Sequence, residues 1–303
     1  MRRIFHRGIP LLFFLAAAFA RAGSPDEIVV ASYNIENYLV TERHDIGALR
    51  GPSGKPEKEI AALVHIIKEI NPDILGVCEI GPKDQFEDLK ARLEKAGLGF
   101  TDFEYVEGPD LDRHLALFSR FPIVEHQSAA DVPFELNGAA LKVRRGFLDV
   151  TVKINPEYKL RLVGAHLKSK LAVPEGEALL RRQEAHLLRK HVDEILAKDP
   201  AANLILYGDF NDTKNEPAIR EIMGPRNAAN HLTDLYLKDN IGDRWTHFWK
   251  TADIYSRIDY FFVSQGLQPE VVNDRSGIYR SPEWNDASDH RAIFTAVRAH
   301  ENK

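Results

Sequence analysis

The sequence predicts an α/β fold in which mixed β-sheets are flanked by helices around one core. Strand-like and helix-like segments alternate along the chain, and the middle third carries several strands joined by tight turns. No internal repeat or Pro/Gly/Ser-rich linker interrupts this pattern. We therefore expect a single domain over residues 23–303, a length that can bury a large core.

The first third of the chain predicts strands and helices in alternation. Residues 28–35 are rich in β-branched and apolar side chains, which is typical of a strand. Residues 56–70 have apolar side chains at helical spacing after an initial proline. A short buried strand over 74–80 and an amphipathic helix over 86–96 follow.

The middle of the chain predicts antiparallel pairing. Three strands are expected there, joined by turns such as Asn155-Pro156, over residues 114–119, 146–154 and 159–167. A long charged helix and three further strands complete the chain, over residues 177–198, 203–207, 258–263 and 292–297.

The N-terminal 22 residues are typical of a secretory signal peptide. Arg2, Arg3 and Arg7 precede an apolar run over 11–20, and small residues allow cleavage after Ala22. The run is shorter than the roughly 20 residues that span a bilayer. We expect an exported protein, periplasmic or secreted, without a membrane anchor after cleavage; an uncleaved N-terminal anchor is the alternative.

Net charge and cysteine content exclude two simple modes of action. Lys and Arg number 40 against 45 Asp and Glu, and removal of residues 1–22 leaves 36 against 45, a net charge of −9. Global charge therefore does not attract nucleic acid, so a local basic patch or a metal must hold any anionic substrate. The single cysteine, Cys78, excludes an internal disulfide, and its apolar surroundings favour a core role over a nucleophilic one.

Polar residues able to bind metal or phosphate cluster at the ends of the predicted strands. Asn34, Glu36, Glu79, His166, Asp209 and Asn211 follow strands, Asp289 and His290 precede the last one, and Asp259 opens another. Each position alone is compatible with a solvated turn. Their joint occurrence indicates a site, because open α/β sheets place ligands at strand ends.

These residues also form an ordered set of motifs: Tyr33-Asn34-Ile35-Glu36, Glu79, Gly208-Asp209-Phe210-Asn211, Arg257-Ile258-Asp259-Tyr260 and Ser288-Asp289-His290. The set resembles that of the endonuclease/exonuclease/phosphatase superfamily, which has the deoxyribonuclease-I-like fold, over about residues 28–297. The resemblance implies a four-layer α/β/β/α sandwich of two mixed β-sheets flanked by helices. It also implies hydrolysis of a phosphate ester with a divalent metal ion.

The resemblance implies metal binding by three acids. Glu79 is the first candidate ligand, Glu36 the second, and Asp289 a further ligand or a support for one. The expected ion is Mg²⁺, with Mn²⁺ or Ca²⁺ as alternatives. Mg²⁺ prefers one or two carboxylates plus water and substrate phosphate, which agrees with this set. A hard cation stabilises the negative charge that develops on the phosphate oxygens.

Catalytic roles are implied for five more residues. Asp209 would orient or deprotonate the attacking water, while Asn211 and Asn34 hold the water or the phosphate. His290 would contact the phosphate, with its tautomer fixed by Asp259. The general base remains open between Asp209 and the pair of His290 and Asp259.

A second histidine and a set of cations complete the implied site. His166 matches a further family histidine, with Asp112 as the acid that supports it. Arg113 and Lys168, with Lys170, would then contact the phosphate; a solvated surface is the alternative for the lysines.

The sequence is less informative about the substrate. Arg144-Arg145 and Arg181-Arg182 are candidate contacts for nucleic acid, although solvated faces are the favoured interpretation. Trp245 and Trp249 are candidates to stack on a base or sugar, although core packing is the favoured interpretation. The inositol-phosphatase branch of the superfamily has a Trp-Cys-Asp-Arg pattern near the position of Ser256-Arg257-Ile258-Asp259. This chain has Arg and Asp there but neither Trp nor Cys, which disfavours that branch.

Three hypotheses follow. The first is a phosphodiesterase acting on a phosphate ester, nucleic acid in particular. The second is a phospholipid phosphodiesterase, similar to sphingomyelinases, or a small-molecule phosphomonoesterase of the same fold. The third is a catalytically inactive binding module, which the intact set of motif residues disfavours.

Overall fold

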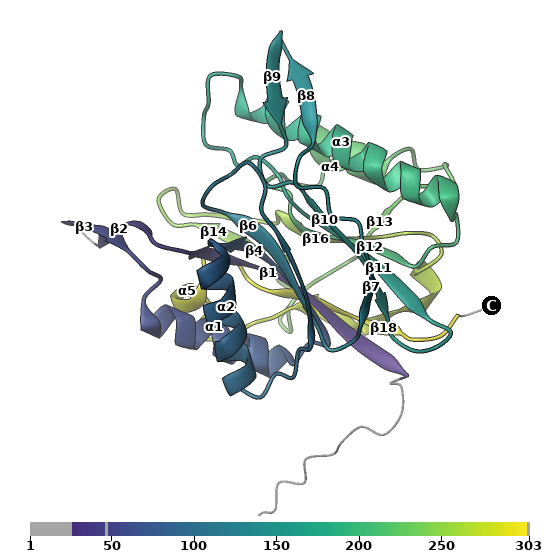
Figure 1. The fold of residues 1–303 in the computed structure, drawn as a ribbon, viewed down its shortest axis with the longest axis horizontal. Coiled ribbons are helices and arrows are strands. Elements are labelled where there is room, and N and C mark those ends of the chain that lie inside the picture. The colour runs from purple at the N-terminus through teal and green to yellow at the C-terminus, as the bar shows by residue number, and fades with distance from the viewer. Residues whose placement is uncertain (1–25, 46–47, 302–303) are drawn as a thin grey trace, which may run out of the picture.

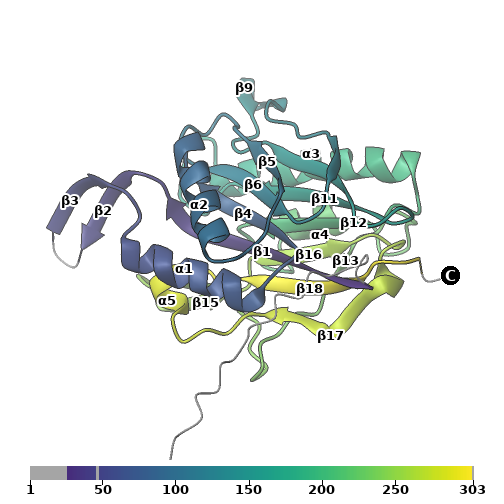
Figure 2. The ribbon, with the colours of Figure 1, turned by 60° about the horizontal axis from the view of Figure 1, so that its bottom comes forward.

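The computed structural model describes residues 26–45 and 48–301. Two six-stranded sheets lie face to face, with helices on both outer sides (Figure 1; Figure 2). This confirms the expected four-layer α/β/β/α sandwich. The predicted signal peptide lies outside the described residues. Among the residues described, no helix is both long and apolar enough to cross a membrane.

The first sheet has one parallel pair at its centre. Its strands, in spatial order, are β17 (Val271–Ile278), β18 (Ile293–Arg298), β1 (Glu27–Tyr38), β4 (Ile74–Ile80), β6 (His114–Ser119) and β5 (Asp102–Val106). Strands β1 and β4 are parallel, and their neighbours pair antiparallel to them. The carboxyl ends of β1 and β4 therefore meet at one edge of this sheet.

The second sheet repeats this arrangement. Its strands are β13 (Thr233–Asp234), β16 (Asp259–Val263), β12 (Leu204–Asp209), β11 (Lys159–His166), β10 (Phe147–Lys153) and β7 (Ile123–His126). Here β11 and β12 form the parallel pair. Three separate hairpins are made by β2 (Thr41–Asp45) and β3 (Ala48–Ser53), β8 (Pro133–Leu136) and β9 (Ala139–Lys142), and β14 (His247–Trp249) and β15 (Ile254–Ser256).

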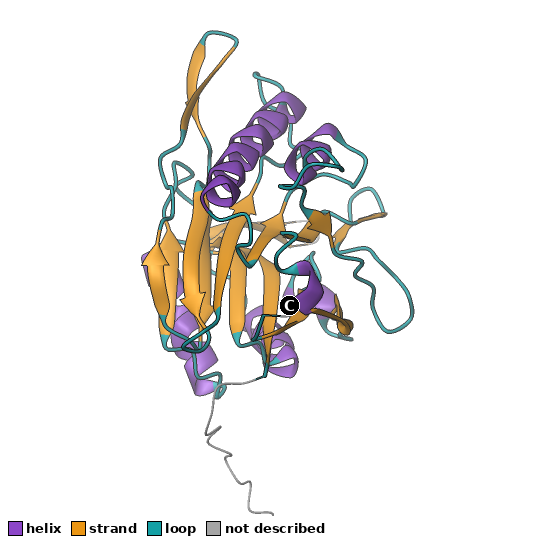
Figure 3. Ribbon diagram, turned by 90° about the vertical axis from the view of Figure 1, so that its right-hand side faces the viewer, coloured by secondary structure: helices purple, strands orange, loops and turns teal. Residues whose placement is uncertain are grey.

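Helices cover the outer face of each sheet (Figure 3). The helices beside the first sheet are α1 (Glu57–Ile70), α2 (Lys83–Lys95) and α5 (Trp284–Ala287), and those beside the second are α3 (Glu177–Lys198) and α4 (Pro217–Met223). A short 3₁₀ turn, η1 (Gln268–Glu270), precedes β17. Helix α1 buries Ile60, Leu63 and Ile67, the apolar stripe that predicted it.

Apolar side chains form three clusters, so the prediction of one core is wrong. One cluster lies between the sheets, and one lies between each sheet and its helices. Successive side chains of β1 point to opposite faces of the sheet and so contribute to two of these clusters. Ile28 and Val30 belong to the cluster between the sheets, whereas Ala31 and Tyr33 belong to the cluster under the helices.

The long predicted elements are confirmed, with one error of pairing. Strands β10 and β11 pair antiparallel as expected, but β6 belongs to the other sheet, where it pairs with β4 and β5. Cys78 is buried between the sheets, with its Sγ 3.8 Å from the carbonyl oxygen of Ala165, which confirms its core position.

Candidate active site

The two parallel pairs bring four of the predicted residues to one place. Asn34 lies near the end of β1 and Glu79 near the end of β4, while His166 and Asp209 are paired at the ends of β11 and β12. Gly208 adopts a φ of 133°, where a Cβ atom would lie 2.0 Å from the carbonyl oxygen of Ala165. A glycine is therefore needed for β12 to approach β11 just before Asp209.

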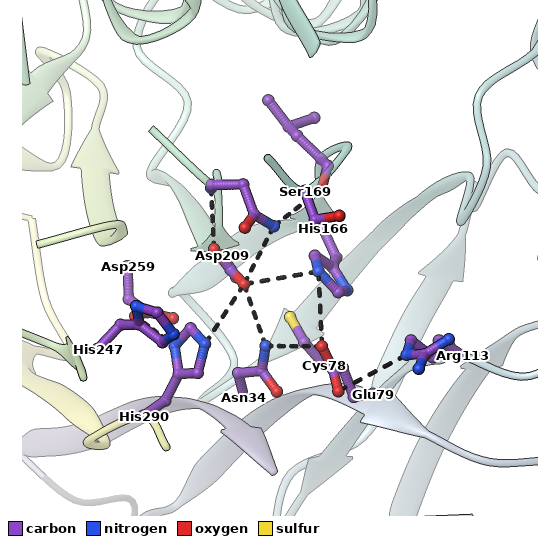
Figure 4. A network of polar contacts seen from close by, with 12 residues as sticks. Asn34, Cys78, Glu79, Arg113, His166, Ser169, Asp209, His247, Asp259 and His290 are labelled. Carbon is purple, nitrogen blue, oxygen red and sulfur yellow. Dashed lines mark hydrogen bonds and ion pairs between the residues drawn. The ribbon is translucent and has the colours of Figure 1, made fainter. Parts of the chain in front are cut away.

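The Asp209 carboxylate is the centre of the site (Figure 4). Its Oδ2 accepts a hydrogen bond from Asn34 Nδ2 at 3.0 Å, and Nε2 of His166 lies 3.5 Å away. His290 Nε2 lies 3.7 Å from the same oxygen, and Asn211 Nδ2 donates to it at 3.3 Å. Burial raises the pKa of Asp209 to about 7; the nearby His290 opposes this shift and Asp259 adds to it.

His290 is held by a second buried acid. Its Nδ1 lies 2.8 Å from Oδ2 of Asp259, and both side chains are nearly inaccessible to solvent. Burial disfavours the charged imidazole, but Asp259 and then Asp209 outweigh it and raise the pKa of His290 well above its usual value. Because Nδ1 donates to Asp259, the Nε2–H of His290 faces Asp209.

His166 is neutral by contrast. Burial lowers its pKa well below the usual value, and the cations Arg145, His290 and Arg113 add to this shift. Its Nε2 lies between Asp209 and Glu79 Oε1, which is 3.9 Å away. The prediction that the Asp112 carboxylate supports His166 is wrong, because Asp112 is exposed and its backbone N–H donates a hydrogen bond to Asp110.

Glu36, Glu79 and Asp289 form an acidic cluster beside this centre. Glu79 accepts hydrogen bonds from Asn34 Nδ2 at 3.3 Å and from the backbone N–H of Asn37 at 2.9 Å. The backbone N–H of Asp289 donates to Glu36 at 3.0 Å. Burial, then Asp289 and Glu79, raise the pKa of Glu36 to about 7, against the opposing charge of Lys55.

Two members of the acidic cluster have a strained backbone. Glu36 and Glu79 have φ values of 45° and 66°, in the left-handed region, as does Asn211 with 53°. Such residues cost about 1–3 kcal/mol each and persist only where their surroundings fix them. Three of the seven non-glycine residues with positive φ in the described part of the chain are site residues, and Glu36 and Glu79 are the two of the seven that are neither Asn nor Asp, the types that tolerate this region.

The acidic cluster has the donor chemistry of a divalent metal site. Carboxylate oxygens are the ligands that Mg²⁺, Mn²⁺ and Ca²⁺ prefer, and a cation would relieve the repulsion that raises the pKa of Glu36. Among the described residues, two groups bring ligand atoms within 4.8 Å of one another, and neither contains Glu36 or Glu79: His247, Asp289 and His290, and Asp209, Asp259 and His290. His290 belongs to both groups, but it already donates to Asp259 and is charged, so it has no lone pair for a metal.

The predicted phosphate-binding cations are placed differently from one another. Arg113 lies beside Glu79, with Nε 3.8 Å from Oε2. Lys168 is buried, and its ammonium donates to the carbonyl oxygens of Ser169 at 2.9 Å and Leu171 at 2.8 Å, within its own loop. Lys170 is exposed and lies 3.4 Å from Asp212.

Two arginines expected on solvated faces are buried instead. Arg181 donates to Asp212, whereas Arg182 beside it is exposed. Arg145 pairs with Asp110 at 2.9 Å, and its Nε and Nη1 have no hydrogen-bond partner within the described part of the chain. Among the cations that lower the pKa of His166, Arg145 has the largest influence.

His247 is a site residue that no sequence motif indicated. Its ring lies 4.7 Å from that of His290, centre to centre, and its Nε2 lies 3.7 Å from Asp289 Oδ2. The β14–β15 hairpin holds it there through an isolated bridge to His290. The prediction that Trp245 and Trp249 pack in the core is wrong, because Trp245 is half-buried and Trp249 is 55% exposed.

Comparisons with known proteins agree with this geometry. The model of the Endonuclease/Exonuclease/phosphatase family matches residues 31–290. No curated protein matches the sequence. Truncated TDP2 from Caenorhabditis elegans superposes with a TM-score of 0.60 and 20% identity, covering 90% of this chain and 98% of that one.

Two further solved structures share the fold. The human Nocturnin catalytic domain with a bound sulfate anion has a TM-score of 0.62 and 20% identity, covering 89% of this chain and 94% of that one. A family protein from Bacteroides thetaiotaomicron has a TM-score of 0.60 and 20% identity, covering 89% and 97%. At these identities the similarity shows the fold alone.

Proposed function

This chain belongs to the Endonuclease/Exonuclease/phosphatase family, a family of hydrolases that act on phosphate ester bonds, and from that premise we propose a metal-dependent phosphodiesterase. The observation that supports it most is the position of Asp209. Its Oδ2 lies within 3.7 Å of both His166 and His290, and it accepts a hydrogen bond from Asn34 at 3.0 Å. A water or a phosphate oxygen at this centre meets a base and several donors at once.

Asp209 is the proposed general base. Water attack forms one P–O bond while the ester P–O bond breaks, and the proton of the water moves to Oδ2 of Asp209. Asn34 and Asn211 fix this carboxylate by hydrogen bonds at 3.0 and 3.3 Å. A base whose pKa lies near the working pH transfers protons efficiently, and Asp209 has a pKa of about 7.

His290 is the proposed donor to the phosphate. Asp259 holds its Nδ1 at 2.8 Å, so Nε2–H is the donor that faces the reacting groups. A charged, fixed donor stabilises the negative charge that builds on the phosphoryl oxygens. Arg113 and the free donors of Arg145 would contact the same phosphate or the next one.

The acidic cluster of Glu36, Glu79 and Asp289 would hold the metal, with Mg²⁺ as the expected ion. A divalent cation there supplies Lewis-acid stabilisation of the phosphate oxygens. Members of the cluster contribute before any metal binds, because Glu79 orients Asn34 and the backbone of Asn37.

Hydrolysis of bis(p-nitrophenyl) phosphate tests this proposal. We expect turnover by the protein from Gly23 onward that depends on Mg²⁺ or Mn²⁺ and stops on addition of EDTA. Asp209→Ala and His290→Ala should each abolish it while the protein stays folded, as judged by thermal unfolding. Turnover that EDTA leaves unchanged, or near-normal rates in either folded variant, would contradict the proposal. Activity on p-nitrophenyl phosphate or sphingomyelin alone would support the alternative esters.

Export is part of the same proposal. The basic start, the apolar run over 11–20 and the small residues up to Ala22 support cleavage by a signal peptidase. Protein recovered outside the cytoplasm should begin at Gly23 by N-terminal sequencing or intact-mass measurement. Intact residues 1–22 on protein that stays in the cytoplasm would contradict this.

A further inference from the structure

Four neighbouring cavities follow one another from the β14–β15 hairpin to helices α4 and α3, and each shares lining residues with the next. Their volumes are about 810, 370, 610 and 780 Å³ in that order. The first and second share Trp245 and Tyr255, the second and third share Lys214, and the third and fourth share Arg220. We call the surface that lines these cavities the basic–aromatic track.

The track is positively charged although the chain is acidic. Nine Lys and Arg side chains line the four cavities, against four Asp and Glu, and five of the nine cations are ion-paired with an Asp. Arg182, Arg220 and Arg226 are exposed, and none has an ion-pair partner among the residues that the structure describes. Cations left unpaired around concave surfaces favour an anionic ligand, because like charges gathered without one repel each other.

The hairpin end of the track presents aromatic rings. Tyr255 is 52% exposed although it stacks on Phe248, with 4.4 Å between ring centres, and meets the edge of Trp245 at 4.8 Å. Trp249 is 55% exposed on the same hairpin. A ring that packs on one side and is open on the other is a stacking platform for a flat ligand group.

The aromatic end of the track adjoins the active site. Ser256 lines the second cavity and lies 3.3 Å from Nδ1 of His247, whose ring lies 4.7 Å from that of His290. Thr213, in the same cavity, follows Asn211 by two residues. His247 therefore lies between the second cavity and His290, and a strand that extends from the track past His247 would reach the groups that surround Asp209.

We propose that the basic–aromatic track binds a single strand of nucleic acid, so that one of its phosphates lies at the active site. This inference rests on the proposed phosphodiesterase function, and it names the class of substrate. The phosphates would lie along Arg182, Arg220 and Arg226, and a base would stack on Tyr255. Grooves that combine cations with stacking rings are how proteins bind single strands without reading sequence.

The alternatives fit the track less well. A small ester or a lipid head group fills a single cavity of a few hundred Å³, which leaves the cations near α4 without a role. The bases of a duplex are stacked on one another and paired, so they cannot stack on Tyr255. We therefore expect a clear preference for single strands over duplexes.

Fluorescence anisotropy with a labelled 20-nucleotide DNA strand tests the proposal, with EDTA present so that binding is separated from cleavage. The double variant Arg220→Ala/Arg226→Ala should weaken binding and reduce the slope of log affinity against log salt by about 1.4, two contacts at about 0.7 each. Tyr255→Ala should weaken binding about 5- to 150-fold, and Tyr255→Phe should restore most of it. The matched control is Lys68→Ala/Lys95→Ala, which removes two exposed lysines from α1 and α2.

The outcomes separate this inference from the proposed function. Equal affinity for the strand and its duplex, or track variants that bind like the control pair, would overturn the track. Metal-dependent cleavage of bis(p-nitrophenyl) phosphate by the unmodified protein tests the proposed function independently. Binding of the strand without cleavage of the ester would support the track and refute the proposed function. Cleavage of the ester, together with track variants that bind the strand as the unmodified protein does, would support the proposed function and refute the track.

Discussion

Replacing Asp259 by asparagine tests how the active site holds its charged histidine. The Asp259 carboxylate lies 2.8 Å from His290 Nδ1, and both groups are buried. At an effective dielectric constant of 20, this separation corresponds to an attraction of about 6 kcal/mol. Asp209 remains 3.7 Å from Nε2 in the variant and still contributes about 4 kcal/mol by the same relation.

The increase in the free energy of activation should be smaller than the full electrostatic attraction, because the amide oxygen of the introduced asparagine can still accept one hydrogen bond from Nδ1. Truncating one partner of a buried hydrogen-bonded charge pair costs about 2–5 kcal/mol. We therefore expect kcat to fall about 30- to 5,000-fold, with little change in KM, since His290 acts mainly on charge that develops in the transition state.

Steady-state kinetics on bis(p-nitrophenyl) phosphate at saturating Mg²⁺ would measure this loss. Asp131→Asn is the matched control, because that side chain is 65% exposed. Thermal unfolding would show that both variants are folded. A fall of less than tenfold in folded Asp259→Asn would refute the role given to the Asp259–His290 pair.

Three further predictions concern other parts of the molecule. Glu79→Gln should weaken Mn²⁺ binding, measured by calorimetry, at least about 10- to 100-fold. Asp149 has a lowered pKa: its burial opposes the shift, but hydrogen bonds from His191 and Arg161 outweigh it. Because the folded pKa lies below the unfolded value, this stabilisation is complete above about pH 5 and is lost as the pH falls below about 4. Asp149→Asn should therefore cost about 3–5 kcal/mol in urea unfolding at pH 7, with a smaller difference near pH 3; a difference independent of pH would contradict this. Gly76→Ala should cost about 1–3 kcal/mol, because its Cβ would lie 2.0 Å from the ring of Tyr207, and Tyr207→Leu should recover part of that loss if the clash is the cause.

The sequence predicted elements well where burial is periodic, and poorly where it is not. Helix α1 has a continuous apolar stripe and was found from it. Strand β17 has three exposed residues in succession and a register shift between Val272 and Gly277, so no alternation marks it. Neither could the sequence place β6, because the short turn from β6 to β7 moves the chain from one sheet to the other. Strand pairing is a property of contacts distant in sequence, which local patterns do not contain.

Site residues were predictable by type and order, but not by the direction their side chains take. Arg144 and Arg145 are equivalent as letters, yet Arg144 is exposed and Arg145 is buried against Asp110. Asp110 and Asp112 differ in the same way, and no local pattern distinguishes the first from the second. His247 lies on the hairpin that directly precedes Arg257, but only the fold brings its ring beside His290.

One geometric rule explains why the polar positions fall at the end of some strands and at the start of others. Parallel strands β1, β4, β11 and β12 contribute from their carboxyl ends. Strand β16 is antiparallel to β12, and its first residue, Asp259, pairs with the last residue of β12, Asp209. Strand β18 is antiparallel to β1, and His290 precedes it in the same way.

The apparent exceptions among the motifs therefore follow from strand direction, since an antiparallel strand begins at the edge where its neighbour ends. Arg113 obeys the same rule, because it precedes β6, which is antiparallel to β4. A site built this way needs both sheets, since neither parallel pair alone supplies both the acidic cluster and the base. The apolar cluster between the sheets holds the two parallel pairs face to face, and Asn34 of the first sheet thereby donates a hydrogen bond to Asp209 of the second. The packing between the sheets therefore sets the geometry of the site.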